Sequence, residues 1–115
     1  MSATPFLYLT THGWKSGRAH QIEIWYVELD GRFYLISERG KRAHWVQNVT
    51  RHPEVTFHVA GGHYQGTARL VDSGDDASLQ RRVQDLFQRK YDWSTGLIVE
   101  LVGELVGELP SGTGS

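Results

Sequence analysis

Apolar and polar side chains alternate along six segments of the chain, which is the pattern of β-strands with one buried face. In the first segment, Leu7, Leu9 and Thr11 fall on one face and the residues between them on the other. Many of the alternating residues are β-branched or aromatic, and these types favour a half-buried pleated surface. The alternation predicts strands over residues 6–11, 21–29, 32–38, 54–60, 63–72 and 96–105.

Two dipeptides indicate which of these strands pair. Asp30-Gly31 stands between the second and third strands, and Gly61-Gly62 stands between the fourth and fifth. Residues of these types tolerate the positive φ angles of a two-residue hairpin turn. Each dipeptide therefore predicts an antiparallel pair of neighbouring strands.

Two other segments have helical spacing. Residues 43–50 carry Trp45 and Val49 one turn apart, and Pro53 ends this short helix because a proline disfavours helical geometry in the residue before it. A longer helix is expected after Asp75 and Asp76, whose negative charge stabilises the positive end of the helix dipole. Its apolar stripe consists of Leu79, Val83, Leu86 and Phe87, and Arg89 and Lys90 lie in its last turn.

About six hairpin-linked strands and two helices predict a mainly β fold, a closed or nearly closed antiparallel barrel. We expect a single domain over residues 1–109. Residues 110–115 are rich in glycine and serine and are expected to form a flexible tail.

The composition excludes several classes of protein. Hydrophobic residues make up 39% of the chain and charged residues 22%, which predicts a folded protein. A net charge of -1 argues against a surface devoted to nucleic acid. The chain has no cysteine, so a disulfide framework and a thiolate zinc site are excluded, and a cytoplasmic location is expected. No apolar run approaches the roughly 20 residues of a membrane helix, so no membrane anchor is expected.

The charge is distributed unevenly along the chain. Residues 1–51 carry a net charge of +3 and the remainder carries -4. Most of the basic residues of the first part lie in two loops, at 15–18 and 39–42. The second loop leads into the short helix, where free N–H groups favour an anion, and Gly40 allows close approach of the backbone to a phosphate. Two solvated turns would show the same spacing, so the loops suggest an anion site without establishing one.

No residue pattern in the chain indicates a catalytic centre of its own. Six histidines occur, but no pair has the spacing of a zinc site, so no metal is expected. Hydrolase, phosphate-loop and dinucleotide-binding motifs do not occur either. This absence suits chemistry carried out by a bound cofactor. Aromatic residues gather near the basic loops, and of these we expect Trp25 and Trp45 to belong to the core.

Three separated motifs lie in the first half of the chain. They are Leu9-Thr10-Thr11-His12-Gly13-Trp14-Lys15-Ser16-Gly17, Ile36-Ser37-Glu38-Arg39-Gly40, and Trp45-Val46-Gln47-Asn48-Val49 with His52-Pro53-Glu54-Val55. These motifs resemble the deazaflavin-dependent nitroreductase family. The likeness runs from about Phe6 to Leu101 and implies a split β-barrel of the pyridoxamine-phosphate-oxidase or FMN-binding type. It also implies a homodimer and hydride transfer from reduced coenzyme F420 to an electron-poor small molecule, such as a quinone, an enone or a nitro compound.

The resemblance assigns roles to the matched positions. Ser37 and Tyr91 are the expected catalytic residues, Tyr91 as a positioner or a proton donor. His20 falls where the family commonly has an arginine. The expected cofactor-binding residues are Trp14, Lys15, Ser16, Arg18, His20, Leu35, Ile36, Ser37, Glu38, Arg39, Arg42, His44, Trp45 and Asn48, the first three holding the phosphate and acidic tail of the coenzyme.

Two alternatives remain open at this point. Trp14 stands where the family usually has an arginine, and the loop from Arg39 to Ala43 is shorter than is common. Both differences change the anion site, so FMN is the alternative cofactor. A non-catalytic carrier of a flavin, haem or lipid on the same barrel is the alternative function.

Overall fold

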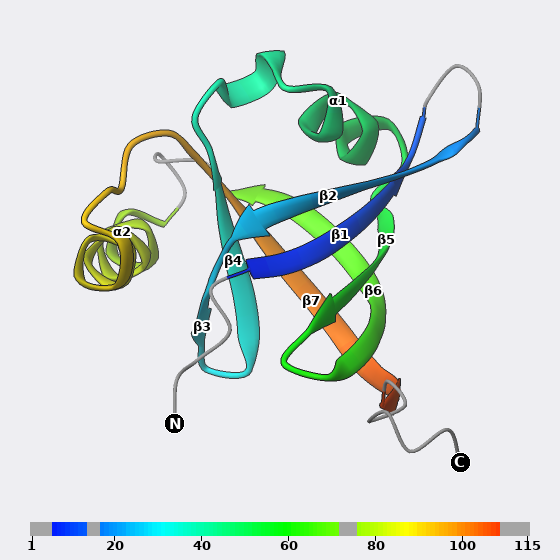
Figure 1. Ribbon diagram of the computed structural model, residues 1–115. Helices are drawn as coiled ribbons and strands as arrows, with labels where there is room; N and C mark the ends of the chain where they lie inside the picture. Colours follow the sequence, from blue (N-terminus) through cyan, green and yellow to red (C-terminus); the bar gives the residue numbers. More distant parts are fainter. Residues whose placement is uncertain (1–5, 14–16, 72–75, 109–115) are drawn as a thin grey trace.

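The computed structural model describes residues 6–13, 17–71 and 76–108, and Figure 1 shows their arrangement. Seven strands in these residues form one antiparallel sheet. They are β1 (Phe6–His12), β2 (Ala19–Trp25), β3 (Val27–Leu29), β4 (Arg32–Ser37), β5 (Glu54–Val59), β6 (Gly62–Val71) and β7 (Leu97–Glu108). A 3₁₀ turn, η1 (Gly40–Arg42), precedes the helix α1 (His44–Arg51), and α2 (Ala77–Tyr91) connects β6 to β7.

The order of the strands makes the sheet curl on itself. It runs β2-β1-β5-β6-β7-β4-β3, so its two edge strands, β2 and β3, are consecutive in the chain. Trp25 pairs with Phe6 in β1, whereas Val27 pairs with Tyr34 in β4. The chain therefore passes from one edge of the sheet to the other at Tyr26. The result is the split antiparallel barrel that the sequence predicts.

Tyr26 also explains why the predicted strand over residues 21–29 is two strands. The N–H of Tyr26 donates a hydrogen bond to the Tyr91 hydroxyl (3.1 Å), which itself donates to the Tyr26 carbonyl (2.8 Å). The Lys90 ammonium donates to the same carbonyl (3.0 Å). Because side chains at the end of α2 satisfy both backbone groups, the strand changes partners here without leaving a buried polar group unpaired.

One of the two predicted turns is displaced by a residue. Asp30 (φ 54°) and Gly31 (φ 79°) form the first turn as predicted. The second turn consists of Ala60 (φ 51°) and Gly61 (φ 83°), and Gly62 already pairs with Val59 inside the sheet. Keeping the apolar residues of β5 on the buried face fixes the register, and this forces Ala60 into the left-handed region.

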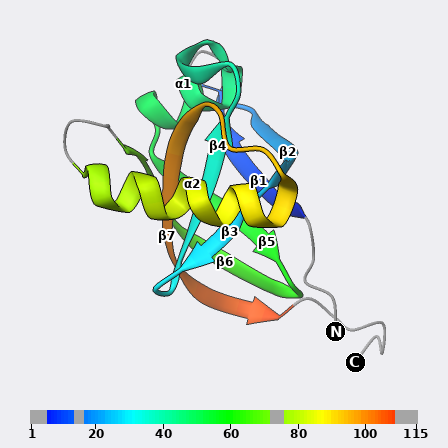
Figure 2. The ribbon, with the colours of Figure 1, turned by 90° about the vertical axis from the view of Figure 1, so that its left-hand side faces the viewer.

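The two helices cover different parts of the barrel. Figure 2 shows α2 lying across β3, β4 and β7, where Val83 and Phe87 pack against Ile36 and Ile98 of the sheet. The Asp76 carboxylate caps this helix by accepting a hydrogen bond from the Leu79 N–H (3.0 Å). The interior of the barrel is a separate cluster that includes Leu9, Leu35, Phe57, Val99 and Leu101.

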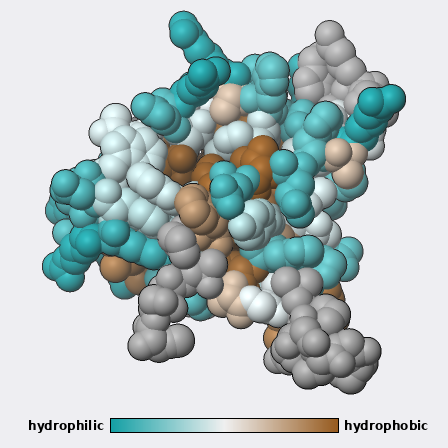
Figure 3. Space-filling model, in the orientation of Figure 1, coloured by the Kyte–Doolittle hydropathy of each residue, from teal (hydrophilic) through white to brown (hydrophobic). Residues whose placement is uncertain are grey.

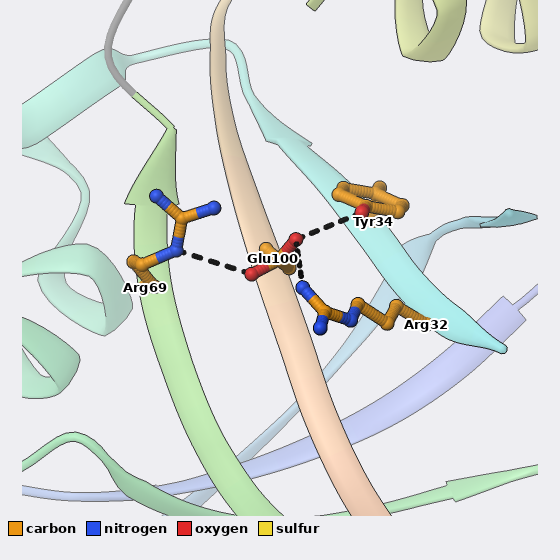
Figure 4. Close-up of polar contacts among 4 residues, drawn as sticks. All are labelled: Arg32, Tyr34, Arg69 and Glu100. Carbon is orange, nitrogen blue, oxygen red and sulfur yellow. Dashed lines mark hydrogen bonds and ion pairs between the residues drawn. The ribbon is translucent and has the colours of Figure 1, made fainter. Parts of the chain in front are cut away.

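One carboxylate is buried on the face of the sheet that carries α2. Glu100 is 2% exposed and accepts hydrogen bonds from the Tyr34 hydroxyl (2.8 Å), the Arg69 Nε (3.1 Å) and an Arg32 Nη (3.2 Å), as Figure 4 shows. Burial raises the pKa of Glu100, but the bonds from Tyr34, Arg69 and Arg32 outweigh it and hold that pKa below its ordinary value. The cluster joins β6, β7 and β4.

Candidate functional site

A cavity of about 510 Å³ lies where the ends of β2 and β4 meet the segment that leads into α1. This volume is within the range of about 300–1,000 Å³ that small-molecule sites occupy. Figure 3 shows apolar surface in this region, between α1 and β2, with hydrophilic side chains around it. The lining residues are Phe6, Glu23, Ile24, Trp25, Ile36, Ser37, Glu38, Arg39, Ala43, Trp45 and Trp93.

A second, more polar hollow of about 760 Å³ continues from the first. Trp45 lines both, and the β2 residues that line them follow one another directly in the chain. We call the first hollow the apolar half and the second the polar half of one groove. The polar half is lined by Thr11, Gly13, Ala19, His20, Gln21, Ile22, His44, Trp45, Gln47 and Asn48.

The structure brings eight of the predicted site residues to this groove. Ile36, Ser37, Glu38 and Arg39 line the apolar half, His20, His44 and Asn48 line the polar half, and Trp45 lines both. Trp14, Lys15 and Ser16 lie outside the described residues. Four further predicted residues, Leu35, Arg18, Arg42 and Tyr91, are not among the lining residues of either half.

These four residues have different surroundings. Leu35 is fully buried in the barrel interior, so only its backbone could contact a ligand. Arg18 and Arg42 are exposed at the two loops that flank the groove. Burial raises the pKa of the Tyr91 hydroxyl, which is hydrogen-bonded to the backbone of Tyr26. The catalytic role of Tyr91 stays a prediction.

Buried hydrogen bonds fix two of the predicted residues in the groove. The Ser37 hydroxyl, 3% exposed, donates to the Gly40 carbonyl (2.9 Å) and so holds η1 against the end of β4. The Asn48 amide donates to the Thr11 hydroxyl (3.1 Å) and so holds α1 against β1. Groove residues lie on α1 and on both sides of η1 in the chain, so these two bonds help to hold the groove wall in place.

Comparison with known proteins agrees with this geometry. The family model of the F420H2-dependent quinone reductases matches residues 1–100 of the chain. The chain belongs to this family. It is therefore an oxidoreductase that uses coenzyme F420, and the resemblance seen in the three sequence motifs is confirmed. No curated protein matches the sequence significantly.

Solved structures confirm the split-barrel fold of this quinone reductase family member. A pyridoxamine 5'-phosphate oxidase-like protein from Listeria innocua has a TM-score of 0.68 at 18% identity, over 88% of this chain and 85% of that one. An F420-H2 dependent reductase, FDR-A, has a TM-score of 0.63 at 22% identity, over 89% and 99%. A chain described as a domain-swapped dimer has a TM-score of 0.62 at 20% identity, over 90% and 82%.

The groove fits the chemistry of coenzyme F420. A planar ring system needs flat apolar walls, and Ile36, Trp45 and Ile24 supply them in the apolar half. The phosphate and acidic tail need hydrogen-bond donors, and His20, His44 and the amide side chains of the polar half supply these. The two halves adjoin at Trp45, as the two parts of one ligand require.

Several groove residues were not predicted from the sequence as part of the site. Phe6, Glu23, Ile24 and Trp93 line the apolar half, and Trp25, expected in the core, is 37% exposed there. The alternation along this strand could have predicted that Trp25 lies outside the core, because it places Trp25 with Glu23 on the face opposite Ile22 and Ile24. The other unpredicted lining residues are Ala43, Thr11, Gly13, Ala19, Gln21, Ile22 and Gln47.

The described residues contain no group of three or more His, Asp or Glu side chains placed to hold a metal ion. None of their helices has the length and apolar character needed to cross a bilayer.

Proposed function

We propose that this protein reduces a quinone, or a similarly electron-poor enone or nitro compound, with coenzyme F420 held along the groove. The observation that carries the proposal is the division of one groove into an apolar half and a polar half that share Trp45. When bound, reduced F420 supplies the hydride. The chain's own residues bind, orient and desolvate the two reactants.

The polar half is the proposed site of the phosphate and acidic tail. His20 and His44 are the titratable side chains among its described lining residues, and both donate hydrogen bonds to an anion when protonated. His44 is also the first residue of α1, where backbone N–H groups favour negative charge. Lys15 and Ser16, with Trp14, remain predicted partners of the same groups.

The apolar half is the proposed site of the reacting rings. Its aromatic and aliphatic walls exclude water, and exclusion of water strengthens electrostatic interactions with the reacting atoms. Arg39 lines this half and is placed to balance negative charge as the acceptor gains electrons. The acceptor takes up the hydride and then a proton, so two electrons pass to it in all.

The cofactor and the reaction are tested with purified protein. We expect F420 to bind saturably and more tightly than FMN in isothermal titration calorimetry, and Lys15→Ala to weaken F420 binding about tenfold through loss of a charge-assisted hydrogen bond. Glu54→Gln, at an exposed position that lines neither half of the groove, is the control. Tighter binding of FMN would refute the F420 assignment.

Turnover separates the enzyme from the carrier alternative. We expect reduced F420 to be oxidised in the presence of 2-methyl-1,4-naphthoquinone, cyclohex-2-enone or nitrobenzene, with a rate that saturates in both substrates. Tight F420 binding without turnover of any of the three would refute the reductase assignment and favour the carrier.

We also propose that the protein is a homodimer. Two observations support this: a structural neighbour is described as a domain-swapped dimer, and β7 exposes Val102, Leu105 and Val106 at 40%, 53% and 55%. Apolar side chains exposed together on one strand are typical of an interface. Light scattering after size exclusion tests the proposal, and a mass of one chain at every concentration would refute it.

A further inference from the structure

The Trp25 indole is a flat wall of the apolar half. Its ring stacks on that of Tyr91 with the centroids 4.4 Å apart and the planes 7° from parallel. The Trp93 ring makes a T-shaped contact with it, with the centroids 5.8 Å apart and the planes at 70°. Tyr91 covers one face of the indole, yet Trp25 remains 37% exposed and lines the cavity. Part of the indole is therefore open to a ligand in the cavity.

Tyr91 holds this indole in a fixed orientation. Its hydroxyl donates to the Tyr26 carbonyl (2.8 Å) and accepts from the Tyr26 N–H (3.1 Å), one residue along the chain from Trp25. Its ring also contacts Phe87 in the core beneath α2, with the centroids 5.5 Å apart. Tyr91 is thus anchored at both ends, and the hydroxyl proton lies on the bond to Tyr26.

Trp25 lies away from the part of the groove proposed for the phosphate and tail of the coenzyme. The coenzyme must run from the polar half past Trp45, which lines both halves. Trp25 and Trp93 line the apolar half but not the polar half. They therefore lie beyond Trp45 from the phosphate and tail, where the second reactant has to bind.

We propose that Trp25, held flat by Tyr91, is the surface on which the electron acceptor stacks. The inference rests on the proposed function and names the acceptor class: a planar, conjugated and uncharged ring, as in a quinone. Parallel stacking favours a flat ring over a puckered one. Glu23 and Glu38 line the same half of the groove with Arg39, so an anionic acceptor gains little there. Tyr91 is a positioning residue in this arrangement.

The test compares a planar acceptor with a non-aromatic one. In Trp25→Ala we expect KM for 2-methyl-1,4-naphthoquinone to rise about tenfold, from the lost stacking and lost apolar contact, and KM for cyclohex-2-enone to change less than threefold. The Kd for F420, measured by calorimetry, stays within twofold of the wild-type value. In Trp25→Phe we expect a smaller rise in KM for the naphthoquinone than in Trp25→Ala, because phenylalanine keeps an aromatic ring. This variant also provides the test if the alanine variant does not fold.

Tyr91→Phe distinguishes positioning from proton donation. This variant keeps the stacked ring but loses the hydrogen bonds to Tyr26, so we expect KM for the naphthoquinone to rise about threefold while the pH profile of kcat keeps its shape. A hundredfold fall in kcat with loss of one limb of that profile would make Tyr91 the proton donor and overturn its assignment as a positioning residue.

Binding without turnover separates this inference from the proposed function. Calorimetry with oxidised F420 present measures the Kd of the naphthoquinone directly, even if no acceptor is reduced. A tenfold higher Kd in Trp25→Ala than in the wild type supports the stacking surface whatever the reaction. An unchanged naphthoquinone Kd, or an equal loss of F420 affinity, would refute it.

Discussion

Glu100→Gln removes one negative charge from the buried cluster that joins β4, β6 and β7 while keeping the shape of the side chain. The Glu100 carboxylate accepts from Tyr34, Arg69 and Arg32. Glutamine offers one oxygen acceptor and places an N–H₂ group where the second oxygen lay. At least one of the three donors then faces another donor, so we expect the variant to fold with clearly reduced stability.

The magnitude follows from the contacts. Burial and the bond to Glu100 raise the pKa of Tyr34 from 10.0 to about 12, and two pKa units correspond to about 3 kcal/mol. Burial is the larger cause, so the bond to the carboxylate accounts for only part of this energy. The side chains of Arg32 and Arg69 are 51% and 53% exposed, so solvent screens them and each contributes at most about 1 kcal/mol. We expect a loss of about 2–4 kcal/mol.

Urea unfolding at pH 7 measures this loss. The expected change lowers the unfolding midpoint by roughly 1–2 M without changing the slope. Glu54→Gln is the matched control, because Glu54 is the first residue of β5 and has an exposed side chain. If the two variants unfold at the same urea concentration, the buried cluster does not stabilise the barrel and the reasoning is wrong.

The free energy of unfolding should depend on pH in opposite directions through Glu100 and Tyr34. Glu100 has a folded-state pKa below its ordinary value, so its contribution is present at neutral pH and is lost as the pH falls below the carboxyl range. Tyr34 has a folded-state pKa above 10.0, so its contribution is complete below pH 10 and is lost as the pH rises toward 12. In Glu100→Gln, the stability lost at low pH and the stability lost between pH 10 and 12 should both be smaller than in the wild type.

Three further substitutions test the fold and the site. Gly66→Ala places a Cβ against the Val102 carbonyl of the neighbouring strand and should cost about 3 kcal/mol or more in urea unfolding, whereas Gly107→Ala meets open space and should unfold like the wild type. Asn48→Ala removes the buried bond to Thr11, so we expect a loss of about 1–2 kcal/mol in the same assay, and an undiminished stability would contradict the bond. His20→Arg places a guanidinium group, which binds phosphate and carboxylate through paired hydrogen bonds, in the polar half and should lower the Kd for F420 about fivefold in calorimetry; an unchanged Kd would place the acidic tail elsewhere.

Most of the fold could be predicted because strands and turns are encoded locally. Alternation located the strands of the sheet except for the break at Tyr26, which divides the predicted strand over residues 21–29 into β2 and β3, and Asp30-Gly31 located the first turn. The second turn was misplaced because Gly61-Gly62 satisfies the local rule for a turn as well as Ala60-Gly61 does. The pairing of β5 with β6 decides between them, and pairing depends on which side chains the rest of the barrel buries.

The residues of the site likewise fall into those that local sequence predicts and those that depend on the folded barrel. Residues of the motifs on β4 and α1, such as Ser37, Trp45 and Asn48, could be predicted, because the family motif places them and local structure presents them. Trp25 and Trp93 could not, since they approach each other only after β2 and the end of α2 come together. Composition alone favours the core for such large apolar rings.

The contacts at Tyr26 connect the closure of the barrel to the acceptor surface. The N–H and carbonyl of Tyr26 are held by side chains of α2 and not by a neighbouring strand, and burial lowers the pKa of the Lys90 ammonium that takes part. The same tyrosine, Tyr91, closes the barrel through its hydroxyl and supports Trp25 through its ring. A change that loosens the end of α2 should therefore reduce the stability of the barrel and the affinity for a planar acceptor together, whereas a change at His20, an exposed residue of the polar half, should alter the affinity for F420 alone.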